Sequence, residues 1–451
     1  MKSPAEARRG PCGRYEKMAQ AGHNIPKRRW IIGVLLGAGV LVNYFDRISL
    51  SVAAPKLQHD FNLSPGEIGL LFSAFFWSYS IFQLPGGIVL DRFGIKTVGR
   101  WGAFLWALAS GVTALASGYA GIFAARLLLG IAEAPGMIGN QKATGYWFPR
   151  HERSRSTAIF DSAAKFSNVI GVPLVAFFIV KFGWRWGFGI TAILSLAYFI
   201  AYWVIYRDPS QDKHLSAQEH NYILAGGATP EGLPPAGQVM MLGYVLRNRK
   251  VWAHTIGYSA YGYSFYLFLT WLPGYMVQTL HMSILKSAAF STIPWIFASL
   301  ADLLIGGFLV DHLIARGHDD TKVRKAVIVA GMTAGLAVFG ATFTTDAVWA
   351  VTWITIALSG LSAAAPVASS IVSLISPRGG TATIGGLVNL VNNLMGVAAP
   401  VVTGFIVGIT HSFSGAFLVA GIVLLVGIVS YVFVLGPIEP IPGPDSGTVP
   451  A

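Results

Sequence analysis

Twelve long apolar runs follow one another along the chain, and they restrict its fold more than any other feature of the sequence. A helix that crosses the hydrocarbon core of a bilayer needs about 20 mainly apolar residues. Because lipid offers no hydrogen bonds, each backbone N–H and C=O must be paired within such a segment, which predicts helices. We therefore expect an all-α membrane protein. The expected spans are 30–54, 66–90, 97–117, 120–146, 156–180, 183–206, 252–278, 287–311, 325–344, 346–374, 381–408 and 412–436.

The composition excludes several other classes of protein. Of the 451 residues, 54% are hydrophobic and only 12% are charged, whereas soluble domains carry roughly 25% charged residues. The net charge of +12 could suit nucleic acid, but the basic residues are spread over the short connections between the apolar runs. We therefore expect no nucleic-acid partner. The single cysteine, Cys12, cannot form an internal disulfide, and no Cys/His cluster has the spacing of a metal site.

The distribution of Lys and Arg predicts the orientation. If both termini are cytoplasmic, the segments on that side hold 24 of the 32 basic residues and the opposite loops hold 4. This bias is typical of the cytoplasmic side of membrane proteins. Residues 1–29 contain eight Lys or Arg and no apolar stretch, which favours a cytoplasmic tail over a cleaved signal peptide.

A polar segment, 207–250, divides the chain into two halves. Its sequence Ser216-Ala-Gln-Glu219 is a capping-box pattern, which predicts a short surface helix. The expected parts are a tail (1–29), a six-helix bundle (30–206), a cytoplasmic loop (207–250), a second six-helix bundle (251–436) and a second tail (437–451).

The two halves also resemble each other in sequence. Pro85-Gly-Gly-Ile-Val-Leu-Asp91-Arg92 closes the second span, and Ile305-Gly-Gly-Phe-Leu-Val-Asp311-His312 closes the eighth, 220 residues later. Parallel repeats of this kind are related by a pseudo-two-fold axis along the membrane normal, with the substrate site near the midplane between them. We therefore expect alternating access between two bundles.

Four charged residues lie inside apolar runs, where they are costly and default to functional roles. Asp46 and Arg47 lie within the run 35–52, and Arg126 and Glu133 lie in another run. Residues three or four apart share a helix face. We expect three such faces to converge on one pocket: Asn43, Asp46 and Arg47; Arg126, Gly130, Glu133 and Met137; and Tyr79 with Gln83.

Specific motifs add a family resemblance. The loop Gly87-x-x-x-Asp91-Arg92-x-Gly94-x-Lys96 resembles the signature of the major facilitator superfamily, in which it forms a charged latch between helices. Asn43-Tyr-Phe-Asp-Arg47 and Arg126-Leu-Leu-Leu-Gly-Ile-Ala-Glu133-Ala-Pro135 resemble the anion:cation symporter family, whose bacterial sugar-acid/proton symporters are the most similar type. Asp91, Arg92 and Asp311 are then expected to be gate or fold residues.

The resemblance implies roles for individual residues. Asp46 and Glu133 would take up and release protons, and Arg126 would pair with a carboxylate and tune its protonation. The expected substrate contacts are Arg47, which would bind the substrate carboxylate, and Tyr44, Tyr79, Gln83 and Asn393. The resemblance also implies a bacterial inner-membrane protein that acts as a monomer in lipid, with a small organic anion and protons as partners and no other cofactor.

Lys165 departs from the pattern of the sugar-acid symporters, which have a polar neutral or aromatic residue near this position in the fifth span. If it faces the cavity, it favours a dicarboxylate or a compact aromatic acid. The alternative is that Lys165 faces another span and extends its ammonium group toward the cytoplasmic interface. Asp302, inside the eighth span, receives no role from the sequence.

The mechanism that these residues favour is competition: substrate and carboxylate compete for Arg47, so that loading an anion promotes protonation. The charged residues can also be structural ion pairs, and the tyrosines and asparagines can simply join helices. Three other functions stay open: an anion exchanger without net proton movement, a phthalate-type permease, and a transport-dead sensor. An enzyme is not expected, because the sequence shows no nucleophile–base pair, metal cluster or phosphate loop.

Overall fold

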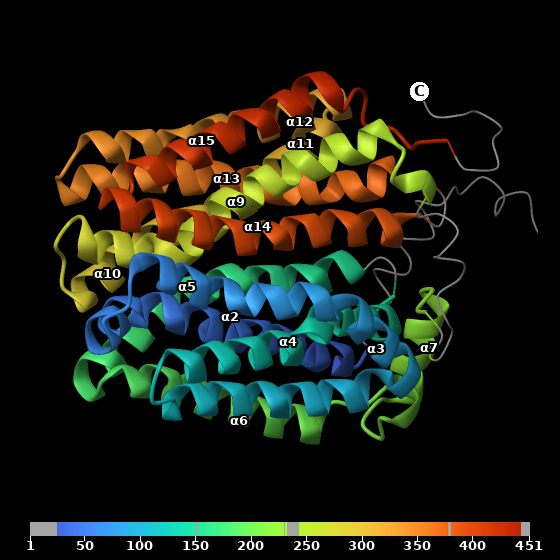
Figure 1. The fold of residues 1–451 in the computed structure, drawn as a ribbon. Helices are drawn as coiled ribbons and strands as arrows, with labels where there is room; N and C mark the ends of the chain where they lie inside the picture. The colour runs from blue at the N-terminus through green and yellow to red at the C-terminus, as the bar shows by residue number, and fades with distance from the viewer. Residues whose placement is uncertain (1–24, 150–151, 230, 232–242, 378–379, 443–451) are drawn as a thin grey trace, which may run out of the picture.

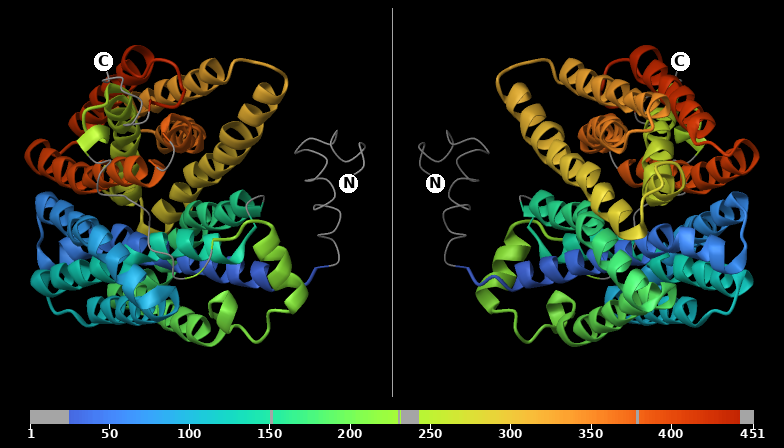
Figure 2. Two further views of the ribbon diagram at one scale, coloured as in Figure 1. Left: turned by 90° about the vertical axis from the view of Figure 1, so that its right-hand side faces the viewer. Right: turned by 90° about the vertical axis from the view of Figure 1, so that its left-hand side faces the viewer.

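The computed structural model describes residues 25–149, 152–229, 231, 243–377 and 380–442. Within these ranges the chain folds into helices and contains no strand. Figure 1 shows two layers of helices, with the chain up to Ile205 in the lower layer and the chain from Arg249 onward in the upper one. Figure 2 shows the same two halves stacked when the molecule is viewed from either end. The predicted all-α architecture is confirmed.

The N-terminal half contains one helix that is too long for a single membrane crossing. A straight helix of 51 residues would be about 75 Å long, more than twice the hydrocarbon thickness of a bilayer. This helix, α3, has a left-handed φ of 77° at Gly94, a conformation that glycine adopts without strain. The helices of this half are α2 (Arg28–Phe61), α3 (Pro65–Leu115), α4 (Tyr119–Trp147), α5 (Arg153–Phe182) and α6 (Trp184–Ile205).

The C-terminal half has irregular turns inside three of its spans. α10 (Ile284–Ala301) continues into the π-helix η4 (Asp302–Leu309) and then α11 (Val310–Ala315). π-Helical turns are rare and often mark functional positions. The remaining elements are α9 (Arg249–Gln278), α12 (Asp320–Gly335) with the 3-10 helix η5 (Leu336–Phe343), α13 (Ala347–Ile375), α14 (Thr381–Thr410), and α15 (Ser414–Val429) with the π-helix η6 (Ser430–Val434).

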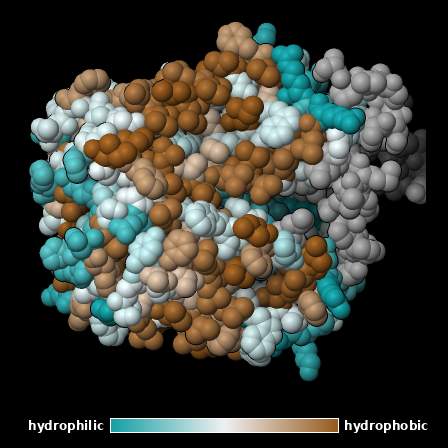
Figure 3. Space-filling view, in the orientation of Figure 1, coloured by the Kyte–Doolittle hydropathy of each residue, from teal (hydrophilic) through white to brown (hydrophobic). Residues whose placement is uncertain are grey.

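An apolar belt surrounds the helices. Figure 3 shows hydrophobic side chains over the middle of the molecule and hydrophilic ones toward both ends. Of the helices described, nine are long and apolar enough to cross a membrane, and the bent α3 counts as a tenth. A total of twelve requires two crossings by α3 and one by α9, and this count stays a prediction.

The predicted helix after Ser216 exists, but it is not a simple surface element. α7 (Ala217–Ala225) begins where the Ser216 hydroxyl accepts a hydrogen bond from the backbone N–H of Glu219. The Glu219 carboxylate is fully buried and accepts from the backbone N–H groups of Arg28 and Arg29, each at 3.0 Å. The predicted surface helix is therefore confirmed, and its buried inner face caps the first turn of α2.

Further ion pairs complete this junction. Nε of Arg29 lies 2.6 Å from a carboxylate oxygen of Glu152, and Arg28 pairs with Asp212 at 2.9 Å. The Tyr222 hydroxyl donates to Glu152 at 2.9 Å. Burial, together with this carboxylate, raises the pKa of Tyr222 to about 12, so the phenol stays neutral and remains a donor. The segment after α6 is thus fastened to the N-terminal half.

The halves approach one another closely at the end opposite α7, which we call the far end. There Gln278 of α9 donates to Gln58 of α2 at 2.7 Å. The backbones of α3 and α14 also touch: a Cβ on Gly69 would lie 2.5 Å from the carbonyl oxygen of Pro400, and one on Gly404 would lie 2.5 Å from that of Pro65. Glycine at these positions lets the far end close.

Candidate functional site

Arg47 and Glu133 form a buried ion pair between α2 and α4. Nη2 and Nε of Arg47 lie 3.1 and 3.2 Å from the same oxygen of Glu133. The two side chains are only 8% and 0% exposed. Asn43, one helical turn before Arg47, lies beside the same carboxylate. The spacing of four residues therefore brings Asn43 and Arg47 to one face, as predicted.

Three aromatic rings surround the guanidinium group of Arg47. Its Cζ lies 4.5 Å from the ring centroid of Phe75, 4.8 Å from that of Tyr44 and 5.0 Å from that of Tyr79. Ring faces at this distance attract a cation. The rings contact the cation through their faces. The N–H groups of the guanidinium therefore remain available to donate hydrogen bonds to carboxylates. The structure thus brings Tyr44 and Tyr79 to Arg47.

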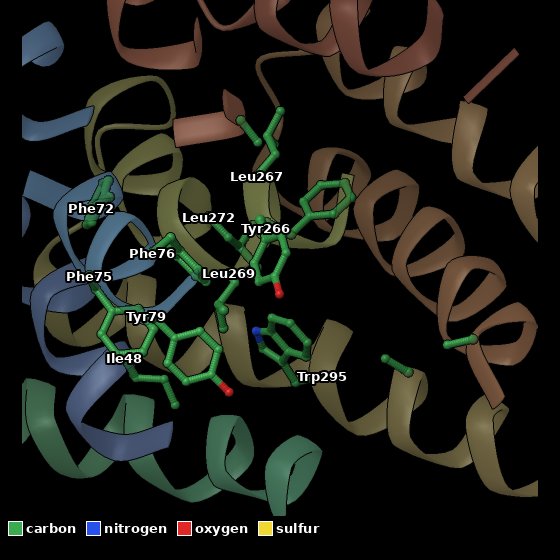
Figure 4. Packing of buried hydrophobic residues seen from close by; sticks show 14 of the residues in the cluster. Ile48, Phe72, Phe75, Phe76, Tyr79, Tyr266, Leu267, Leu269, Leu272 and Trp295 are labelled. Atoms are coloured by element: carbon green, nitrogen blue, oxygen red, sulfur yellow. The ribbon is translucent and has the colours of Figure 1, made fainter. Parts of the chain in front are cut away.

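The C-terminal half contributes to the same region through Tyr266. The ring of Tyr266 lies 4.7 Å from that of Phe76 in α3, and its hydroxyl donates to the side-chain oxygen of Asn393 at 3.2 Å. Figure 4 shows Phe76 and Tyr79 on one side of this boundary and Tyr266 on the other. Asn393 is buried. The Arg47 site therefore lies where the two halves meet.

Asp46 points away from that site, into the core of the N-terminal half. Its carboxylate accepts hydrogen bonds from Trp106 Nε1 at 2.5 Å, Ser110 Oγ at 2.6 Å and Ser195 Oγ at 2.8 Å. The residue is only 1% exposed. The expectation that Asp46 shares a face with Arg47 is wrong, because consecutive residues point about 100° apart around a helix.

Arg126 differs from its expected pairing as well. Its Nη1 donates to the backbone carbonyl oxygen of Asp46 at 2.9 Å, and its Cζ lies 5.9 Å from the ring of Phe75. Arg126 is buried beside both carboxylates, but the hydrogen bond holds the α2 backbone instead of a carboxylate oxygen. Its position supports α2 at the point where Asp46 and Arg47 diverge.

The sequence did not single out the three donors to Asp46. Trp106 and Ser110 are four residues apart in α3, so they share a face, and Ser195 lies on α6. The sequence signal that could have found Trp106 and Ser110 is their helical spacing within an apolar run. Their partner could not be deduced, because it lies on a different helix.

A pocket lies beside the Arg47–Glu133 pair. It holds about 640 Å³ of empty space, part of which is continuous with solvent, and it is lined by residues of α2, α3, α4 and α6. Arg47 and Glu133 lie on its wall, and so does Trp106, the partner of Asp46. Other lining residues include Asn43, Met137, Asn140, Tyr198 and Tyr202.

The signature loop forms local contacts. Asp91 pairs with Lys142 of α4 at 2.6 Å, so this ion pair joins two helices of one half. Arg92 is exposed and lies over Phe93. Around Gly87 the nearest atom to an added Cβ lies 4.0 Å away, so the closer approach to α4 is at Gly86. Gly94 forms the turn, and the side chain of Asp311 lies outside the described part.

Lys165 of α5 and Asp302, the first residue of η4 after α10, form an ion pair between the two halves. Lys165 therefore faces another span, as one of the two interpretations of the sequence held, and Asp302 gains a partner. Gln83 lies one turn beyond Tyr79 on α3 and is half-buried. Among the described residues, no group of three or more His, Cys, Asp or Glu is arranged to hold a metal ion.

Comparison with known proteins identifies the family. Residues 36–400 match the family model of the Major Facilitator Superfamily. The chain belongs to this superfamily. It is therefore a multi-pass membrane transporter and not an enzyme. The match confirms the resemblance carried by the signature loop.

Individual relatives indicate which transporters of the superfamily this chain resembles. The chain is 40% identical to "Uncharacterized transporter YybO" of Bacillus subtilis (strain 168), over 94% of this chain and 97% of that protein. It is also 32% identical to "Probable galactarate/D-glucarate transporter GudP" of Escherichia coli (strain K12). That match covers 94% of this chain and 97% of that protein. The crystal structure of a D-xylose-proton symporter is similar in fold, with a TM-score of 0.70 at 16% identity, covering 90% of this chain and 98% of that one.

Proposed function

We propose that this chain imports a small polyhydroxy carboxylate, such as an aldonate, an aldarate or a hexuronate, together with protons across the bacterial inner membrane. The observation that carries the proposal is the buried Arg47–Glu133 pair beside the boundary between the halves. The 32% identity to a protein named for galactarate/D-glucarate transport supports a sugar acid as substrate.

Competition for Arg47 couples the anion to a proton. Guanidinium groups bind carboxylates through paired N–H donors, so an incoming substrate carboxylate can take the place of Glu133. Glu133 is then a fully buried carboxylate without its cation. Because burial disfavours the charged form of a carboxylate, it takes up a proton. Release of the substrate returns Arg47 to Glu133 and expels that proton.

Asp46 is the second proton site in this proposal. Its three hydrogen-bond donors are neutral, and no cation pairs with its carboxylate among the described residues. Protonation requires only that one hydroxyl, of Ser110 or Ser195, turn to accept in place of donating. Two acids allow more than one proton for each anion, which makes uptake of a monovalent acid electrogenic.

The direction of import rests on the orientation of the halves. The bias of basic residues supports a cytoplasmic position for α7 and both termini. The close contacts at the far end, between Gln58 and Gln278 and between α3 and α14, then close the outer side. This arrangement corresponds to an inward-facing state, from which substrate and proton leave to the cytoplasm.

Purified protein in liposomes with a trapped pH dye tests the proposal. Addition of galactonate or galactarate outside should acidify the interior, and the signal should be lost in Glu133→Gln and in Asp46→Asn. The matched control is Glu439→Gln, which alters a carboxylate that is 65% exposed and should leave the signal intact. Entry of labelled acid without acidification would overturn proton coupling and favour exchange.

A further inference from the structure

The Lys165–Asp302 pair is a second buried charge site, and the proposed function does not use it. It joins α5 of one half to η4 of the other, with side chains that are 16% and 18% exposed. A charged side chain within a membrane is costly when it is unpaired. A group that displaces Lys165 or Asp302 from this pair must therefore carry the same charge as the residue that it displaces.

The packing of α2 on α5 places Lys165 relative to Arg47. A Cβ on Gly37 would meet Ile159, and one on Gly171 would meet Phe45, so the two helices run side by side in the same direction. Lys165 lies midway between Ile159 and Gly171, level with about residues 41–43 of α2. At about 1.5 Å per residue, it lies roughly 6 to 9 Å from the level of Arg47, toward the α7 end.

The carboxylate partner also lies near the aromatic residues of the Arg47 site. The hydroxyl of Tyr261 in α9 is within electrostatic range of both Asp302 and Tyr44, and Tyr44 packs on Arg47. Asp302 is the first residue of the π-helix η4, where α10 departs from regular α-helix. Such a departure changes the direction of side chains at its start, and it recurs at functional positions.

We propose that Lys165 is a second anion subsite, occupied by Asp302 until the distal carboxylate of a dicarboxylate substrate replaces it. The inference rests on the proposed function, in which Arg47 binds the proximal carboxylate. The end carbons of an extended six-carbon chain are about 6 Å apart, from ordinary C–C bond lengths. That span is comparable to the offset between the levels of Lys165 and Arg47 along α2.

Charge balance explains why this subsite selects a dicarboxylate. A second carboxylate can exchange with Asp302 at the ammonium group of Lys165 and leave that cation paired. The displaced Asp302 then takes up a proton, as Glu133 does when it loses Arg47. A monocarboxylate offers only a hydroxyl at its distal end, so Asp302 stays on Lys165 and the subsite adds nothing. Hydrogen bonds to charged groups are stronger than neutral ones by an amount equivalent to about 5- to 10-fold in affinity.

Binding and uptake of two matched acids test the subsite. Galactarate and galactonate share a six-carbon polyhydroxy chain and differ only at C6. The full-length protein should bind galactarate about 5- to 10-fold more tightly than galactonate. Lys165→Gln should abolish that preference. Asp302→Asn, which removes the competing carboxylate, should tighten galactarate binding.

Three outcomes would overturn the inference. They are equal binding of the two acids by the unmodified protein, an undiminished preference in Lys165→Gln, and equal losses for both acids in Lys165→Gln. The double variant Lys165→Gln/Asp302→Asn removes both charges while keeping the side-chain shapes, so it separates loss of the subsite from misfolding. Proton-coupled galactonate uptake without a dicarboxylate preference would leave the proposed function intact and refute the subsite alone. Absence of binding by both acids would refute both.

Discussion

Adding one methyl group at Gly69 should open the far end of the transporter. A Cβ there would lie 2.5 Å from the carbonyl oxygen of Pro400 and 3.3 Å from Cα of Val401. Both are backbone atoms of α14, so they cannot rotate aside as a flexible side chain would. Normal contacts are about 3.5 Å, so Gly69→Ala requires α3 and α14 to separate locally by about 1 Å.

The size of the effect follows from the cost of overpacking. Inserting a methyl group into a well-packed contact costs about 1 to 3 kcal/mol. The cost falls on the state in which the far end is closed and is relieved when the halves part. Because 1.4 kcal/mol is a tenfold change in an equilibrium constant, the ratio of far-end-closed to far-end-open molecules should fall about 5- to 150-fold.

A cross-linking assay reports this ratio. Cys12 is the only cysteine, so a Cys12→Ser background allows a new pair at Gln58 and Gln278, whose side chains are 2.7 Å apart. Gly69→Ala should slow formation of that cross-link and increase labelling of either cysteine by a membrane-impermeant maleimide. The matched control is Gly111→Ala on the same helix, since an added Cβ there would have no atom within 4 Å.

The reasoning fails if Gly69→Ala leaves the cross-linking rate unchanged. It also fails if Gly111→Ala slows the reaction to the same extent, because the effect would then come from an alanine in α3 and not from contact with α14. A thermal unfolding curve for each variant separates a shift between transport states from general loss of the fold.

Three further outcomes are expected from other contacts. Glu219→Gln weakens the buried junction of α7 by about 3 kcal/mol, the lower end of the range for a broken buried pair, and should speed limited trypsin digestion after α6. Trp106→Phe removes one donor to the buried Asp46 carboxylate, which is worth about 1.5 to 3 kcal/mol, so the melting temperature of the purified protein should fall measurably. Lys142→Ala breaks a half-exposed pair with Asp91, worth less than about 1 kcal/mol, and a large drop in melting temperature would contradict this account.

Local features of the sequence predicted the spans and the charged positions. Long apolar runs become helices in lipid whatever their neighbours are, because each helix satisfies its own backbone. The same argument marked Asp46, Arg47, Arg126 and Glu133, because a charge within such a run is costly. The Ser216 cap was also visible, since it is made within one turn of the chain.

Only the tertiary structure decided which groups these side chains contact. Asp46 and Arg47 are neighbours in sequence, yet one binds Trp106 in the core of the N-terminal half and the other binds Glu133 near the boundary. Glu219 lies on a short helix that looks solvent-exposed, but it is buried against the start of α2.

The pairing of Lys165 with Asp302 shows why such contacts escape sequence reasoning. Helical periodicity fixes the angle between two residues of one helix, but not which neighbouring helix each one faces. That choice depends on how α5 and α10 pack across the two halves, which involves residues far apart in the chain. The sequence by itself determined a membrane transporter with buried charges, and helix packing determined which charges meet.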